Sequence, residues 1–284
     1  MGQLTIILGP TGVGKSDMAM KMAVGKGCGI ISADSRQIYR EIPIGTAAPT
    51  AEMQQMVHHW FVGTRSVTEH YSAGQFEIDA IPVIEQEIAS HGEALMAGGS
   101  MMYIDAIAKG IDAIPDIEDE VRTRVRRMYE QEGIEAMRRR LKLLDPQYYA
   151  EVDLMNWKRI LHAIEVCEQT GATFTELRTG VCHKRTFSIR KIGVRRQRED
   201  LYRRIDLRVE KMMDMGLEKE ARNVYPMRNL NALNTVGYKE LFGYFDGEYD
   251  IKEAVRLIQR NTRHYARKQM TWFQRDGEIE WIDL

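Results

Sequence analysis

The sequence has 284 residues, of which 44 % are hydrophobic and 29 % are charged, so the chain can bury a sizeable core and is not disordered. Its net charge of −1 does not indicate a protein that binds polyanions over its whole surface. No apolar run approaches the roughly 18 residues of a membrane span, and no basic stretch opens the chain as in a signal peptide. Cys28, Cys167 and Cys182 lack disulfide or metal-site spacing and predict reduced thiols in a cytoplasmic protein.

The first predicted strand, residues 4–8, leads directly into the sequence GPTGVGKS. This spacing is that of a P-loop, in which glycines let the backbone wrap an oligophosphate with its N–H groups and the following helix adds its dipole. Lys15 supplies a positive charge, and the Ser16 hydroxyl can bind Mg²⁺. The predicted phosphate-binding residues are Gly9, Pro10, Thr11, Gly12, Val13, Gly14, Lys15 and Ser16. The spacing does not show whether the phosphate belongs to a nucleotide.

Apolar runs and helical patterns alternate along the rest of the first hundred residues, which is typical of βα units and a parallel sheet. Strands are predicted over residues 29–32 and 93–97, and helices over about 15–24 and 78–89. A similar pattern returns near the end of the chain. It predicts a strand at 187–194, helices at about 199–215, 217–225 and 251–274, and a strand at 279–282.

The middle of the chain, from about 116 to 180, has only helical patterns. One apolar stripe there contains Ile160, Ala163, Ile164 and Cys167, and Gly171 is placed to end its helix. We therefore expect an α/β fold, with a P-loop NTPase-like parallel sheet core flanked by helices and a helical insertion domain. The expected core spans 1–115 and 184–284, and the expected insertion spans 116–183.

Two further strand ends carry polar residues. Asp34 follows the second strand, at the edge where open α/β sheets bind their ligands. It could hold Mg²⁺ through water or act as a general base, although an Asp there could also cap the following turn. Gly98, Gly99 and Ser100 follow the third strand, where small residues let a backbone or hydroxyl approach phosphate, or simply form a tight turn. The histidines, including the pair at 58–59, show no zinc pattern.

Positive charge gathers in two segments, 121–142 and 184–208, where Arg and Lys outnumber Asp and Glu. The first segment could grip backbone phosphates of a nucleic acid, or it could be an ordinary solvated helix face.

The chain resembles the tRNA dimethylallyltransferases, the isopentenyltransferases that modify an adenosine beside the anticodon. The resemblance runs in order along almost the whole chain, which makes ten individually weak blocks a strong signal together. The blocks are GPTGVGKS at 9–16, DSRQIY at 34–39, GTAAP at 45–49, HHW at 58–60, YSAGQF at 71–76, GGSMMY at 98–103, NWKRILHAIEV at 156–166, LYRRIDLRVEKMMDMGLEKEA at 201–221, NTVGYKE at 234–240 and RHYARKQMTWF at 263–273.

This resemblance implies that the P-loop residues 9–16 bind the diphosphate of dimethylallyl diphosphate, with Mg²⁺ as cofactor and Ser16 as a ligand. The dimethylallyl group is then transferred to N6 of the adenosine 3′-adjacent to the anticodon, which gives N6-isopentenyladenosine and diphosphate. Asp34 matches the general base of the family. Ser100 stands where the family usually has Thr and keeps the hydroxyl, while Arg204 or Arg208 matches its diphosphate-binding Arg.

The resemblance also implies that the anticodon stem-loop of tRNA is the partner, with the target base flipped out of the stack. His162 stands where the family usually has Arg, and no zinc-finger pattern follows Trp272, as in bacterial members. We expect a cytoplasmic monomer with no membrane partner. The implied tRNA contacts are Asp34, Ser35, Arg36, Gln37, Lys158, Arg159, Ile160, Leu161, His162, Asn234, Thr235, Val236, Gly237, Tyr238 and Lys239.

Three alternatives remain on the residues alone. A small-molecule kinase would also use a P-loop, for ATP, and an Asp after the second strand. An adenylate isopentenyltransferase would prenylate a free nucleotide, although the long helical insertion argues against it. A nucleic-acid-binding switch that hydrolyses nucleotide would need an apolar strand ending in Asp, whereas strand 93–97 ends in Gly-Gly.

Overall fold

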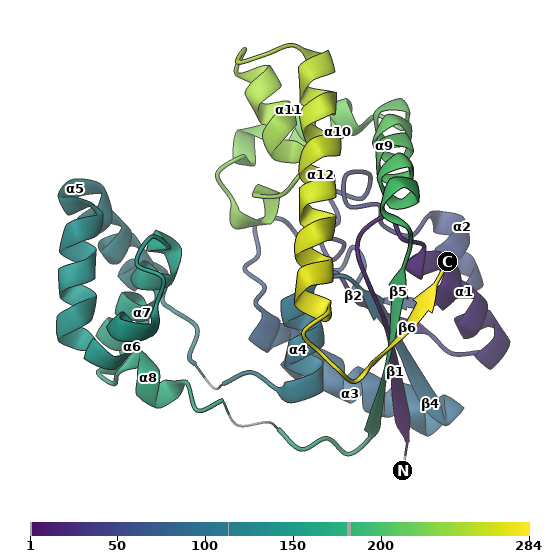
Figure 1. The fold of residues 1–284 in the computed structure, drawn as a ribbon, viewed down its shortest axis with the longest axis horizontal. Helices are drawn as coiled ribbons and strands as arrows, with labels where there is room; N and C mark the ends of the chain where they lie inside the picture. The colour runs from purple at the N-terminus through teal and green to yellow at the C-terminus, as the bar shows by residue number, and fades with distance from the viewer. Residues whose placement is uncertain (1, 113, 181–182) are drawn as a thin grey trace. The chain divides into compact units, whose positions relative to one another are not determined.

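The computed structural model describes residues 2–112, 114–180 and 183–284 and divides the chain into two compact units (Figure 1). The first unit comprises Met1–Ala108 and Lys184–Leu284, and the second comprises Lys109–His183. In the described part of the chain, no helix is long and apolar enough to cross a membrane. Cys28 and Cys167 are free and buried, while Cys182 lies outside the described residues.

A six-stranded sheet of parallel strands forms the centre of the first unit (Figure 1). Its order is β3-β2-β4-β1-β5-β6, so the first strand of the chain lies inside the sheet, between β4 and β5. The predicted fold class is confirmed. The strands are β1 (Gln3–Leu8), β2 (Ile30–Ala33), β3 (His59–Trp60), β4 (Glu93–Gly98), β5 (Ser188–Arg195) and β6 (Ile279–Asp283).

Helices cover both faces of this sheet, because β1 is apolar on both of its sides. Leu4, Ile6 and Leu8 pack with side chains of α3 and α4, while Ile7 packs with Ala19 of α1 and with side chains of α9 and α12. The helices of the first unit are α1 (Lys15–Lys26), α2 (Ala51–Met56), α3 (Ala73–His91), α4 (Met101–Lys109), α9 (Arg198–Asp214), α10 (Leu217–Val224), α11 (Tyr238–Phe245) and α12 (Ile251–Phe273), with 3-10 turns at Tyr225–Met227 and Asn231–Leu233.

The second unit is a small helical domain with its own apolar core. The predicted stripe of α7 is buried, and α7 ends at Gly171 with a φ of 73°, as the sequence indicates. Helix α5 is broken at Gly133, where φ is 74°. The helices are α5 (Asp119–Leu144), α6 (Pro146–Glu151), α7 (Trp157–Thr170) and α8 (Phe174–Leu177).

Some elements differ from the prediction. The helix predicted over 78–89 begins earlier, at Ala73, because the Ser72 hydroxyl caps it by accepting the Gln75 N–H (3.0 Å). Helices α2, α4 and α11 and strand β3 were not predicted. Two of them lack a clear local signal, since α2 buries no residue and β3 has two residues.

Candidate active site

The predicted phosphate loop lies at the carboxyl end of β1, the central strand of the sheet. Gly9, Gly12 and Gly14 have φ angles of 147°, 81° and 110°, which L-residues with side chains rarely adopt. A Cβ atom at Gly9 would also clash with the backbone oxygen of Val194. The conformation of the loop therefore requires these glycines, as expected for a backbone that wraps a phosphate group.

Three arginines that follow β5 bind the outside of this loop. The Arg196 Nε donates to the Val13 carbonyl (2.8 Å), and the Arg204 Nε donates to the Gly12 carbonyl (3.0 Å). The Arg208 Nη1 donates to the Thr11 hydroxyl (3.2 Å). Arg204 and Arg208, the two candidates for the diphosphate-binding arginine, thus both lie at the loop. Burial lowers the pKa of Arg208, and the nearby Asp34 opposes this effect.

The Lys15 ammonium turns back onto the loop and donates to the Pro10 carbonyl (2.8 Å). Burial, followed by repulsion from Arg208, lowers the pKa of Lys15 to about 7, although Asp34 partly offsets this. Cations held this close destabilise one another. An anion bound in the loop would relieve that repulsion, so the electrostatics favour a phosphate ligand.

Asp34 caps a turn with one of its carboxylate oxygens. Its Oδ1 accepts the backbone N–H groups of Arg36 (2.9 Å) and Gln37 (3.3 Å), so it does cap the turn after β2. Among the described residues no hydrogen bond reaches its Oδ2, and the carboxylate lies within electrostatic reach of Lys15 and Arg208. Oδ1 therefore holds the turn after β2, and Oδ2 is left without a hydrogen bond from the described residues.

Ser100 is buried and anchors the segment that begins at Asp34. Its Oγ accepts the Ser35 N–H (2.8 Å) and bonds to the Ser35 hydroxyl (3.1 Å). Its own N–H donates to the Ala33 carbonyl (3.1 Å). The observed role of Ser100 is thus to position the loop, and a contact with substrate stays a prediction.

Two residues of α12 belong to the site but were not singled out from the sequence. Gln269 is 2 % exposed, and its amide accepts the Thr11 N–H and donates to the Gly99 carbonyl, both at 2.8 Å. Tyr265 lies one helical turn earlier, where burial and the charge of Asp34 raise its pKa to about 12. The available signal was a Gln on an otherwise apolar stripe of this helix.

The predicted tRNA-binding segments of the first unit are joined by hydrogen bonds. Arg36 donates to the carbonyls of Asn231 and Ala232, at 3.1 and 3.2 Å, and thereby binds the chain just before segment 234–239. Tyr238 is fully buried, and its hydroxyl donates to Glu220 (2.6 Å). The Tyr238 side chain therefore belongs to the core, and a tRNA contact of this residue stays a prediction.

In the second unit, some of the predicted tRNA-binding residues are buried and others are exposed. The Ile160 and Leu161 side chains lie in the apolar core, and a tRNA contact of these two residues stays a prediction. Lys158, Arg159 and His162 are exposed and stay predicted contacts.

Several arginines of the basic segment 121–142 form ion pairs or hydrogen bonds within the helical unit. Arg124 and Arg140 form ion pairs with Glu168, and Arg138 donates to the Leu154 carbonyl (3.0 Å from Nε). Arg139 is exposed, and no acidic partner for it occurs in the ranges that the structure describes. Only part of this segment is thus free to contact a nucleic acid.

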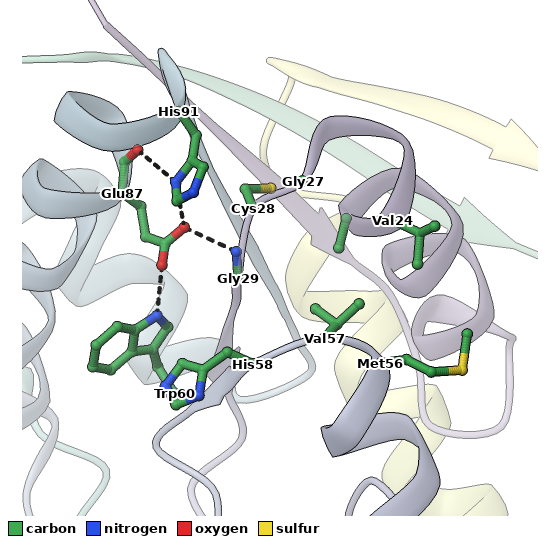
Figure 2. A pocket seen from close by; sticks show the side chains of 11 residues that line it. Val24, Gly27, Cys28, Gly29, Met56, Val57, His58, Trp60, Glu87 and His91 are labelled. Carbon is green, nitrogen blue, oxygen red and sulfur yellow. Dashed lines mark hydrogen bonds and ion pairs between the residues drawn. The ribbon is translucent and has the colours of Figure 1, made fainter.

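A pocket of about 420 Å³ lies at the amino ends of β2 and β4, away from the phosphate loop, and contains none of the predicted site residues (Figure 2). Its buried carboxylate, Glu87, accepts the Gly29 N–H (2.9 Å) and the Trp60 Nε1–H (2.8 Å) and also contacts His91 (3.2 Å). Each oxygen is therefore occupied in joining α3 to β2 and β3, which is a structural role.

The side chains near the phosphate loop can be compared with the ligands that the predicted Mg²⁺ would need. Within the described residues, no group of three or more His, Cys, Asp and Glu side chains could hold a metal ion. Ser16 is exposed in the first turn of α1, directly after the loop. Because Mg²⁺ keeps several waters and usually takes its other ligands from substrate phosphates, one hydroxyl beside a phosphate site fits a Mg²⁺ ion that arrives with a diphosphate.

These features define the class of protein. An α/β sheet with an anion-binding loop, surrounding cations and a carboxylate within electrostatic reach is typical of an enzyme that transfers a group from a phosphorylated substrate. The sequence profile of the IPP transferase family matches residues 37–276. The chain is 55 % identical to tRNA dimethylallyltransferase 2 of Porphyromonas gingivalis and 52 % identical to tRNA dimethylallyltransferase 1 of Bacteroides fragilis, in both cases over 98 % of this chain and 93 % of the relative.

Solved structures agree with the sequence relatives. The full-length tRNA isopentenylpyrophosphate transferase of Bacillus halodurans is 30 % identical, with a TM-score of 0.72 over 100 % of this chain and 90 % of that one. A eukaryotic dimethylallyltransferase acting on tRNA, 21 % identical, shares the fold with a TM-score of 0.80 over 100 % and 74 %. The chain belongs to the tRNA dimethylallyltransferase family, as the sequence resemblance predicts.

The lowered pKa of Lys15 predicts proton uptake on ligand binding. In the free protein the ammonium loses its proton as the pH rises through about 7, whereas a bound diphosphate favours the charged form and raises that pKa. At pH 8 the protein should therefore take up a proton with inorganic diphosphate, and its affinity should fall from pH 7 to 9. Calorimetry in buffers of different ionisation enthalpy measures this uptake. Equal uptake by Lys15→Met would contradict it, since the titration of diphosphate itself is common to both proteins.

The position of Gln269 predicts that this residue also affects the binding of inorganic diphosphate. Gln269→Leu leaves the Thr11 N–H and the Gly99 carbonyl without partners, so we expect the loop to lose its shape and the affinity for diphosphate to fall about 10-fold. The control is Gln259→Leu on the same helix, whose amide donates to the Asp206 carbonyl (3.4 Å). A thermal shift without loss of diphosphate affinity would show that Gln269 only stabilises the fold.

Proposed function

We propose that this protein transfers the dimethylallyl group from dimethylallyl diphosphate to N6 of the adenosine 3′-adjacent to the anticodon in tRNA, giving N6-isopentenyladenosine and diphosphate. One observation supports this reaction above the others. Lys15 and Arg208 each interact electrostatically with the Asp34 carboxylate, so one site would supply both the charge that binds the leaving group and the base. We also propose that the protein is cytoplasmic and acts as a monomer.

The donor half of the reaction needs positive charge. The bond between C1 of the allyl group and the diphosphate oxygen breaks, and its electron pair leaves on the diphosphate. Lys15 and the arginines at 204 and 208 are placed to offset this developing charge. Ser16 would hold a Mg²⁺ ion bound to the diphosphate, which would supply further positive charge.

The acceptor half needs a base, because the N6 lone pair of adenine is delocalised into the ring and makes a poor nucleophile. N6 forms the new bond to C1, and its proton passes to a carboxylate. Asp34 suits this task, since one of its oxygens caps the turn and fixes the side chain while the other accepts no hydrogen bond from the described residues.

We propose that exposed basic side chains bind the tRNA. The candidates are exposed and have no acidic partner among the described residues. They are Lys158 and Arg159 on α7, Arg139 on α5 and Lys239 on α11. Arg124 and Arg140 would bind a phosphate group more weakly, because Glu168 already neutralises part of their charge.

A transfer assay tests the reaction and separates it from its alternatives. Incubation of the protein with tRNA, dimethylallyl diphosphate and Mg²⁺, without ATP, should give N6-isopentenyladenosine on mass spectrometry of the digested tRNA, whereas Lys15→Ala should give none. Free AMP should not replace tRNA as acceptor. A strict requirement for ATP would overturn the proposal in favour of a kinase.

The role of Asp34 is tested separately. Asp34→Asn keeps an oxygen for the Arg36 and Gln37 N–H groups but removes the base, so single-turnover transfer should slow about 10²-fold or more while tRNA affinity changes little. Asp283→Asn, on an exposed side chain of β6, is the control. An unchanged transfer rate in Asp34→Asn would mean that Asp34 only positions the substrate.

A further inference from the structure

The helical unit presents an exposed aromatic side chain whose orientation is fixed. Trp157 is the first residue of α7, and 38 % of it is exposed. The ring of Tyr129, from α5, lies parallel to its indole, with centroids 5.2 Å apart and an interplanar angle of 5°. A tryptophan held by a neighbouring helix in this way keeps its orientation while much of its surface stays open.

The turn that carries Trp157 is also held by several hydrogen bonds. The Arg138 guanidinium donates to the Leu154 carbonyl, at 3.0 Å from Nε and 2.6 Å from Nη2, and contacts the Met155 sulfur (3.4 Å). The Asn156 side chain caps α7 by accepting the Arg159 N–H (3.4 Å). The segment 154–157 is thus already ordered, so binding a ligand there would cost little conformational entropy of the protein chain.

Positive charge lies beside this ring. The Lys158 ammonium lies 5.5 Å from the Trp157 ring centroid, and the Lys158 and Arg159 side chains are exposed. In the described ranges neither has an acidic partner, whereas Arg124 and Arg140 of the same unit are both paired with Glu168. The surface therefore combines a flat aromatic group with unpaired cations.

We propose that Trp157 stacks on an unpaired base of the tRNA, while Lys158 and Arg159 bind the neighbouring phosphates. Aromatic side chains among cations are typical of surfaces that bind single-stranded RNA, because every base has a face on which to stack. Bases of a duplex stem are stacked on one another, so the partner is a loop nucleotide. This inference rests on the proposed function, which makes tRNA the substrate.

The test compares RNAs as well as variants. Dissociation constants are measured for an anticodon stem-loop and for a duplex of the same stem without a loop. Trp157→Leu should weaken stem-loop binding about 10-fold, leave duplex binding unchanged and leave the salt dependence unchanged. Trp157→Phe, which keeps an aromatic face against Tyr129, should bind the stem-loop nearly as the unchanged protein does. Lys158→Gln combined with Arg159→Gln should weaken both RNAs and reduce the salt dependence.

Leu143→Ala is the control, since Leu143 is an apolar side chain of the same unit that is 84 % exposed. Stem-loop binding by Trp157→Leu at the unchanged level would overturn the proposal. Equal losses of Trp157→Leu and Trp157→Phe, or equal losses for stem-loop and duplex, would also overturn it, because they would show a structural role. Failure of the transferase function would appear differently, as absence of isopentenyladenosine with the unchanged protein.

Discussion

The phosphate loop keeps its shape because side chains from distant parts of the chain bind its outer surface. A loop with three glycines at positive φ has much conformational freedom to lose. Arg196 and Arg204 bind its carbonyl oxygens, and Gln269 ties its Thr11 N–H to the neighbouring turn at Gly99. The site therefore depends on the docking of α9 and α12 against the sheet, and not on the loop sequence alone.

Helix α12 extends this dependence beyond the loop. Its Gln269 contacts the loop, its Arg263 pairs with Asp206 of α9, and its Asn261 donates to Glu240 (2.7 Å). Glu240 in turn accepts the Gly237 N–H (2.8 Å), at the start of α11. One helix thus supports both the proposed donor site and a proposed tRNA-binding segment, which keeps the two in a fixed relation.

Local signals in the sequence predicted much of the fold. The glycines of the P-loop, the apolar strands and the α7 stripe ending at Gly171 are each encoded by neighbouring residues. Three features depend on contacts between distant segments and could not be predicted. Gln269 belongs to the site because it binds Thr11 and Gly99, and Ser100 anchors Ser35 across 65 residues of sequence. Tyr238 is buried in an apolar cluster, where its hydroxyl donates to Glu220. A block that resembles a family does not separate its core residues from its contact residues.

The helical unit and the sheet unit each bury an apolar core of their own. Val125, Leu141 and Ile164 pack in the core of the helical unit, while β1 and its neighbouring helices form the core of the sheet unit. Segments that share one apolar core unfold together in a single cooperative transition. No apolar cluster of the described residues combines side chains of both units, so we expect each unit to have its own free energy of unfolding.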